Sequence, residues 1–179
     1  MEIENGIFKN LQFLKSPNFN ERPDQEEIRL IIIHSISLPP KIYGKTYVED
    51  FFLNKLNIDE HNYFEQIKDL KVSSHIYIKR DGKAVQFVPF NKRAWHAGES
   101  SYKGVNNCND YSIGIELEGS DDDIYSDLQY EMLIKITNEI INEYPMLDKK
   151  SIIGHSDVSP GRKVDPGSKF DWNRFLEAL

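Results

Sequence analysis

The sequence predicts a single α/β domain, residues 1–179, with a mixed central β-sheet flanked by helices. Apolar, β-branched runs alternate along the chain with segments of helical periodicity, the pattern of a sheet covered by helices. Two of these runs are joined by Asp81-Gly82, a dipeptide typical of a hairpin, so the sheet should contain antiparallel pairs as well. A length of 179 residues suits one domain with a proper core and is short for two.

Composition and charge narrow the class of protein. Hydrophobic residues make up 39% and charged residues 28%, as in ordinary globular domains. The formal charge of −7 argues against a nucleic-acid partner. The single cysteine excludes an internal disulfide and a cysteine-based zinc cluster. The sequence shows no secretory signal pattern and no apolar run near the roughly 18 residues of a membrane span, so we expect a cytoplasmic protein without a membrane partner.

The first half of the chain predicts a buried strand, a helix and a hairpin. Residues 28–33 are a continuous apolar run that ends at His34 and is broken by "SISLPP". His34 could face a cleft or be a core histidine bonded to a carbonyl, and this stretch leaves both readings open. Residues 47–56 carry apolar side chains at helical spacing, which predicts a helix lying on the sheet. Residues 74–89 alternate on both sides of Asp81-Gly82, which predicts the hairpin.

The second half predicts two more strands and two helices. Residues 112–119 alternate, with Glu116 on the face opposite the isoleucines. Residues 126–144 predict the clearest helix, because a capping-box pattern precedes a long apolar stripe. Residues 151–155 read as a short buried strand, and "FDWNRFLEAL" as a short closing helix.

Two predicted strands each deliver a histidine at their carboxyl end, His34 and His155. Ligand sites of open α/β sheets favour that edge, so the two side chains are expected to lie together. His155 opens the segment "GHSDVSPGRKVDPG", which reads either as a solvated loop or as a site that also contributes Asp165. Two imidazoles and one carboxylate suit a catalytic Zn²⁺ with a fourth position for water, although non-haem iron can use the same ligands.

Two further residues suit hydrolysis beside such a metal. Lys163 would share a side of the extended chain with Asp165, and its cation could stabilise an oxyanion or give a proton to a leaving amine. Glu116 could act as the general base that accepts a proton from the water. Scattered His, Glu and Asp are common, and no compact motif such as HExxH is present, so spacing alone leaves this arrangement a hypothesis.

Several segments together resemble the cytoplasmic AmpD-type N-acetylmuramoyl-L-alanine amidases. They are "VEDFFLNKL", "SSHIYIKRDG", "RAWHAG", "CNDYSIGIELEGSDD" and "GHSDVSPGRKVDPG", within a match that runs from about "SPNFNERP" to "FDWNRF". The resemblance implies the fold shared with peptidoglycan recognition proteins. It also implies one zinc per chain held by His34, His155 and Asp165, with Glu116 as acid/base and Lys163 as the catalytic lysine. The implied reaction cuts the amide between the lactyl group of muramic acid and L-alanine. The implied substrate is a small, soluble 1,6-anhydro-muropeptide recycled from the cell wall.

Substrate contacts carry over from the resemblance as six candidates: Ser35, Tyr63, Lys71, Trp95, His96 and Asn107. Three of them depart from the family pattern, since Lys71 stands where arginine is frequent, Ser35 where asparagine is expected, and Asn107 where a basic residue is common. For Tyr63 an aromatic core position is as good an interpretation as a pocket position.

Other functions remain to be weighed against the amidase. A non-catalytic protein that binds peptidoglycan fragments could use the same fold, but it would typically lack one of the ligands or catalytic residues that are all present here. A zinc peptidase acting inside the stem peptide would have a similar site. A secreted, wall-lytic amidase is disfavoured by the missing signal pattern and wall-binding module. The oligomeric state stays open.

Overall fold

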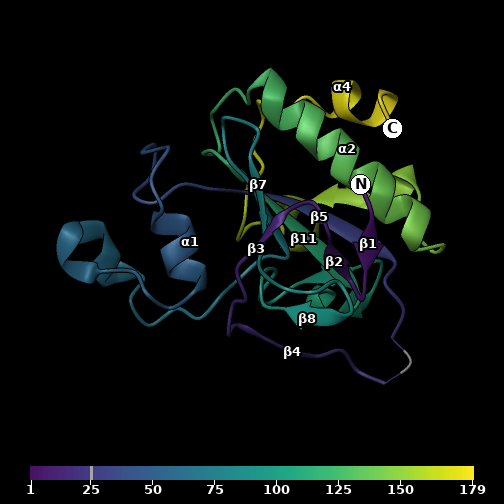
Figure 1. The fold of residues 1–179 in the computed structure, drawn as a ribbon, viewed down its shortest axis with the longest axis horizontal. Helices are drawn as coiled ribbons and strands as arrows, with labels where there is room; N and C mark the ends of the chain where they lie inside the picture. Colours follow the sequence, from purple (N-terminus) through teal and green to yellow (C-terminus); the bar gives the residue numbers. More distant parts are fainter. Residues whose placement is uncertain (25) are drawn as a thin grey trace.

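The fold is organised around a six-stranded mixed sheet in the order β12-β5-β11-β6-β7-β3 (Figure 1). The computed structural model describes residues 1–24 and 26–179. The strands of this sheet are β3 (Gln12–Phe13), β5 (Leu30–Ile36), β6 (Ile76–Ile78), β7 (Ala84–Gln86), β11 (Ser112–Glu118) and β12 (Ile152–Gly154). β12, β5, β11 and β6 run parallel, and β7 is antiparallel to β6. The predicted mixed α/β architecture is confirmed.

Two helices cover one face of this sheet. They are α2 (Asp127–Glu143) and α4 (Trp172–Glu177), which lie on the same side of the sheet in Figure 1. Because side chains alternate along a strand, Ile113 and Ile115 of β11 point to this side and join one core with Leu133 of α2 and Phe175 of α4. The alternate residues of β5 and β11, which include His34 and Glu116, are thereby directed to the opposite face.

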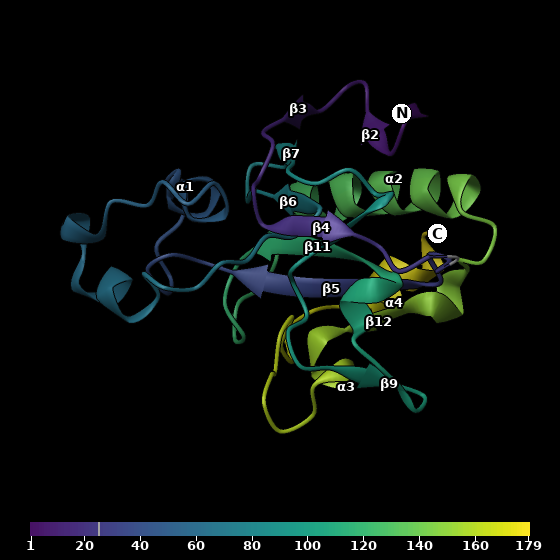
Figure 2. The same ribbon diagram turned by 90° about the horizontal axis from the view of Figure 1, so that it is seen from below.

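The opposite face is closed by α1 (Tyr47–Phe52), α3 (His155–Val158) and irregular segments. Figure 2 shows β5 running toward the lobe that contains α1, so the carboxyl edge of the sheet faces this lobe. The 3-10 helices are η1 (Ile58–Glu60), η2 (Asn62–Gln66), η3 (Cys108–Asp110) and η4 (Lys149–Ser151). The remaining strands form three small antiparallel pairs: β1 (Ile3–Glu4) with β2 (Ile7–Phe8), β4 (Phe19–Glu21) with β8 (Lys92–Ala94), and β9 (Ser101–Tyr102) with β10 (Val105–Asn106).

The strongest local sequence signals are confirmed. Ser126 caps α2, its hydroxyl accepting the Gln129 backbone N–H while the Gln129 side chain accepts the Ser126 N–H. The hairpin of β6 and β7 turns through Gly82, whose φ of 81° is the left-handed conformation that glycine adopts without strain.

Three elements differ from their expected bounds. β5 does not stop at His34, because Ser35 and Ile36 continue the ladder with Leu117 and Glu118 of β11. α1 ends at Phe52 instead of residue 56, because Asn54 takes a left-handed φ of 57° that a helix cannot continue. The segment after β12, expected as a loop, opens with one helical turn, α3.

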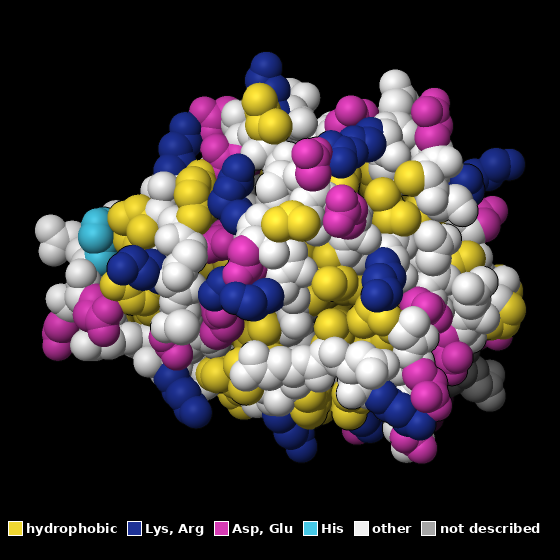
Figure 3. All heavy atoms as spheres, turned by 45° about the horizontal axis from the view of Figure 1, so that its top comes forward, with side chains coloured by type: hydrophobic (Ala, Val, Ile, Leu, Met, Phe, Trp, Pro, Cys, Tyr) yellow, Lys and Arg dark blue, Asp and Glu magenta, His cyan; other side chains and the backbone are white. Residues whose placement is uncertain are grey.

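Charges of both signs alternate over the face turned forward in Figure 3, with hydrophobic side chains in small groups between them. Within residues 1–24 and 26–179, no helix has the length and apolar character that a bilayer crossing requires.

Candidate active site

Four side chains stand in a row across the carboxyl half of the sheet. His34 of β5 and Glu116 of β11 are register partners on adjacent parallel strands, and Glu116 is in turn the partner of Tyr77 on β6. On the other side of β5, Gly154 of β12 pairs with Ile33, so the next residue, His155, stands beside His34. Parallel pairing therefore brings together histidines that are far apart in the sequence.

His34, His155 and Asp165 converge on one point at the edge of this row. The Nδ1 atoms of His34 and His155 are 2.9 Å apart, and Asp165 Oδ2 lies 3.2 Å from the first and 3.0 Å from the second. All three residues are buried, with exposed fractions of 1%, 3% and 7% respectively. Among the described residues, this trio is the one cluster of three or more His, Cys, Asp or Glu side chains placed to share a cation.

The donor set fits a metal ion. The Nε2 atom of His155 lies 3.1 Å from the carbonyl oxygen of Ala97, which can only accept, so Nε2 carries the proton and Nδ1 presents a lone pair. Tetrahedral ligands about 2.0–2.1 Å from a zinc ion are about 3.3 Å apart, close to the separations seen here. A lone pair and a carboxylate crowded together at this distance repel each other unless a cation lies between them.

The charge states of His34 and Asp165 agree with this interpretation. Burial lowers the pKa of His34 to about 4, so its imidazole is neutral near pH 7. Burial alone would raise the pKa of the Asp165 carboxyl, but interactions with His155 and His34 hold it well below its usual range. A neutral imidazole and an ionised carboxylate are the forms that ligate metals.

The loop that carries Asp165 is held in place by contacts with its surroundings. The Ser156 N–H donates to the Asp165 carbonyl oxygen at 3.1 Å, and the Tyr125 hydroxyl donates to the Pro166 carbonyl at 2.6 Å. Gly167 lies so close to another backbone segment that a Cβ atom there would be 1.9 Å from the Asp121 carbonyl oxygen. Only glycine permits this approach, which holds the loop of Asp165 against the backbone at Asp121.

Glu116 is buried beside the trio with an unused oxygen. Its Oε1 lies 4.0 Å from His34 Nδ1, and its Oε2 has no hydrogen-bond partner. Burial raises the pKa of the Glu116 carboxyl well above its usual range; the Asp165 charge adds to this rise and Lys163 opposes it. Such a shift moves a carboxyl group toward the range in which general bases work at neutral pH.

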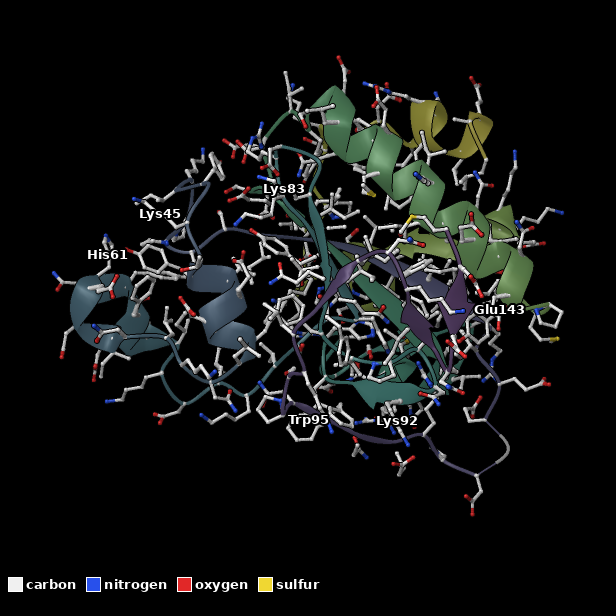
Figure 4. All side chains as sticks on the ribbon, in the orientation of Figure 1. Lys45, His61, Lys83, Lys92, Trp95 and Glu143 are labelled. Atoms are coloured by element: carbon white, nitrogen blue, oxygen red, sulfur yellow. The ribbon has the colours of Figure 1, made fainter. Side chains whose placement is uncertain are left out.

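A cavity of about 500 Å³ opens over these residues. Its walls include the exposed Lys163, which therefore faces the same space as Glu116, His155 and Asp165. Of the six substrate-contact candidates, four also line the cavity: Ser35, Tyr63, Trp95 and His96. The Trp95 indole N–H donates to Asn20 Oδ1 of β4 at 2.7 Å, and Figure 4 shows Trp95 beside that strand. The Ser35 hydroxyl is buried without a hydrogen-bond partner.

The other two candidates lie outside this cavity. Lys71 lines a separate depression of about 50 Å³ near Asn54 and Lys68. Asn107 lines a groove beside Ser100 and Ser159. Their role in substrate binding stays a prediction.

One residue of the cavity wall was missed by the sequence reasoning. The Arg162 guanidinium donates to the carbonyl oxygens of Ala97 and Glu99 at 2.7 and 2.6 Å, and to the Ser159 hydroxyl. It thereby joins the loop of Lys163 to the carbonyl that orients His155. The sequence placed this arginine among other charges, and nothing local marked its carbonyl partners, which lie more than 60 positions away.

Comparisons with known proteins agree with the geometry. A family model described as N-acetylmuramoyl-L-alanine amidase matches residues 24–168. The 1,6-anhydro-N-acetylmuramyl-L-alanine amidase AmpD of Haemophilus influenzae is 47% identical over 178 residues, which cover 99% of this chain and 97% of that protein. The crystal structure of a selenomethionine AmpD derivative superposes with a TM-score of 0.97 at 45% identity, covering 100% and 99% of the two chains. The Escherichia coli amidase AmiD, solved with anhydro-N-acetylmuramic acid-L-Ala-D-γ-Glu-L-Lys, has a TM-score of 0.63 at 25% identity, covering 90% of this chain and 65% of that one.

Proposed function

The chain belongs to the N-acetylmuramoyl-L-alanine amidase family and is an enzyme of that family, and from this premise we propose that it is a zinc-dependent amidase of 1,6-anhydro-muropeptides. The bond cut is the amide between the lactyl group of the anhydro-muramic acid and L-alanine. The relatives named for this substrate match nearly the whole chain, which supports the assignment. A role in recycling wall fragments in the cytoplasm belongs to the same proposal.

The observation that carries the proposal is the convergence of His34, His155 and Asp165 within 3.2 Å of one another. His155 and Asp165 lie at the wall of the cavity that Glu116 and Lys163 also line. These three residues would hold one zinc ion. When bound, zinc supplies Lewis-acid activation of water and of the amide carbonyl group.

The chain's own residues then carry the proton and the charge. Glu116 takes a proton from the attacking water, for which its unpartnered Oε2 is free. The Lys163 ammonium group stabilises the negative charge that develops on the amide oxygen. As the C–N bond breaks, the proton on Glu116 passes to the departing nitrogen of L-alanine, and the lactyl carbonyl carbon keeps the water oxygen as a carboxylic acid.

Product analysis tests the proposal. The zinc-loaded protein is incubated with a 1,6-anhydro-muramyl tripeptide, and the products are identified by mass spectrometry. We expect free anhydro-muramic acid and an intact tripeptide that begins with L-alanine. Anhydro-muramic acid that retains L-alanine would identify a peptidase acting inside the stem. Binding without any product would leave only a protein that binds wall fragments.

A further inference from the structure

A chain of polar groups leads from His34 away from the cavity. His34 Nε2 lies 2.9 Å from His96 Nδ1, and the His96 Nε2 atom lies 3.2 Å from the Ser112 hydroxyl. That hydroxyl lies 2.6 Å from the carbonyl oxygen of Cys108. The chain connects a ring of the metal-binding trio to the backbone of η3.

The Cys108 carbonyl, at the end of this series of polar groups, decides the direction of every hydrogen bond in the series. The Cys108 carbonyl can only accept, so the Ser112 hydroxyl donates its single hydrogen to that oxygen. The hydroxyl oxygen must then accept from His96 Nε2–H, which leaves Nδ1 of the neutral His96 ring as an acceptor. That acceptor receives the Nε2–H of His34. His34 is therefore left with an unprotonated Nδ1, the atom that faces His155 and Asp165.

The position of the His96 ring depends on a glycine. The ring lies against β11 at Gly114, where a Cβ atom would be only 2.4 Å from His96 Nδ1. On the same residue, the Gly114 backbone N–H donates to His75 Nδ1 at 3.0 Å, which holds the strand. The His96 backbone N–H donates to Asn109 Oδ1 at 3.2 Å. The ring therefore occupies a site shaped for it, in edge-to-face contact with His34 at a centroid distance of 5.0 Å.

We propose that His96 is a positioning residue that fixes the tautomer of His34, and that Gly114 and Ser112 fix His96 in turn. The proposal rests on the proposed metal site. It makes His96 a residue that orients a ligand of that site, in place of the substrate contact expected from the sequence. A histidine ligand whose outer nitrogen loses its partner can rotate or carry its proton on the wrong nitrogen, and loss of such a partner typically weakens metal binding by about 10–100-fold.

Zinc affinity tests the proposal separately from catalysis. The dissociation constant is measured by competition with a chromophoric chelator for the wild type, His96→Phe and His96→Asn. Phenylalanine keeps a ring but offers no acceptor, so we expect the dissociation constant to rise about 10–100-fold. Asparagine can offer its side-chain oxygen to the His34 Nε2–H, so we expect it to restore most of the affinity. His61→Ala serves as the control. His61, labelled in Figure 4, lies in the lobe that contains α1, and the dissociation constant of this variant should match that of the wild type.

A second measurement needs no variant. In the ¹⁵N-labelled wild-type protein, the imidazole nitrogen shifts should report a proton on Nε2 of both His96 and His34. A proton on His96 Nδ1 would overturn the proposal, even if the variants fail to fold.

The outcomes separate this proposal from the proposed function. A wild type that binds no zinc defeats the metal site itself. A wild type that binds zinc, with an unchanged dissociation constant in His96→Phe and a raised KM for the muropeptide, defeats only the positioning role and makes His96 a substrate contact.

Discussion

Glu116 and His34 are nearest neighbours across the pairing of β11 and β5, with Glu116 Oε1 4.0 Å from His34 Nδ1. The proposed base and a proposed metal ligand are thus placed by the backbone ladder of two buried strands, which is more rigid than a placement on loops. Asp165 and Lys163 come instead from a loop, whose position depends on contacts such as that of Gly167 with Asp121.

The zinc content of the protein should depend on each residue of the trio His34, His155 and Asp165. We expect the purified protein to bind about one zinc ion, and His34→Ala, His155→Ala and Asp165→Ala each to lose most of it, because a catalytic zinc site is typically held by three protein ligands. Elemental analysis measures this, with His61→Ala as the control. Undiminished zinc in any of the three variants would remove that residue from the ligand set.

Glu116 and Lys163 should affect turnover without affecting the metal. We expect Glu116→Gln and Lys163→Ala to keep their zinc and to lose roughly 10²–10⁴-fold in kcat, the range for a general base or an oxyanion donor. Lys169→Ala changes an exposed lysine that follows this segment in the chain and should keep full activity. Wild-type turnover in Glu116→Gln would end its assignment as the base.

The enzyme should prefer the anhydro sugar. In the proposed cytoplasmic role the enzyme would also meet UDP-linked muramyl peptides with the same amide bond, and their hydrolysis would destroy wall precursors. The Trp95 indole is held in place by its hydrogen bond to Asn20. We expect the cavity wall around it to accept the compact bicyclic ring of the anhydro sugar and to disfavour a sugar with a bulky group at its anomeric carbon. The ratio of kcat/KM for the two substrates should be about tenfold or more. A ratio near one would point to a general muramyl amidase.

Gly167→Ala should damage the loop of Asp165. The new methyl group would meet the Asp121 carbonyl at 1.9 Å, and the φ of 90° disfavours any side chain. We expect the free energy of unfolding to fall by at least about 2 kcal/mol, and zinc affinity to fall with it. Gly161→Ala is a matched control, because its φ of 79° is also positive but its surroundings are open. Denaturant unfolding should show a smaller loss there; equal losses would rule out the close approach as the cause.

Acid should destabilise the protein through His75, a buried histidine that is not one of the proposed metal ligands. Burial, with a smaller effect of the Arg22 charge, lowers the pKa of His75 to about 3. The unfolded chain takes up this proton below about pH 6.5 and the folded chain only near pH 3, so stability is lost as the pH falls through this window. This one group should remove about 2 kcal/mol between pH 7.5 and pH 5.

His75→Gln tests this assignment in metal-free protein. The variant should be less stable at pH 7.5, because the bond from Gly114 N–H to the ring is lost, but its stability should decline less on acidification. The free energy of unfolding at several pH values measures both. An unchanged pH slope would show that other groups cause the acid sensitivity.

The sequence by itself determined the elements with strong local signals. The alternation of β11, the capping box at Ser126 and the turn at Gly82 each depend on residues within a few positions of one another, so the pattern predicts the structure. The segments that resemble the amidase family predicted the amidase itself. The histidines at the ends of two predicted strands, His34 and His155, together with Asp165, nominated the trio that the structure brings together.

Tertiary structure alone decided what depends on contacts between distant segments. The length of β5 depends on its neighbour β11. The position of Lys71 and Asn107 outside the cavity over Glu116 depends on where whole loops pack. The packing of His96 on Gly114 and its bond to His34 join residues of three different strands or loops. A sequence pattern reports periodicity along one segment, whereas a hydrogen-bond chain across strands depends on register and close packing, which form only when the segments come together.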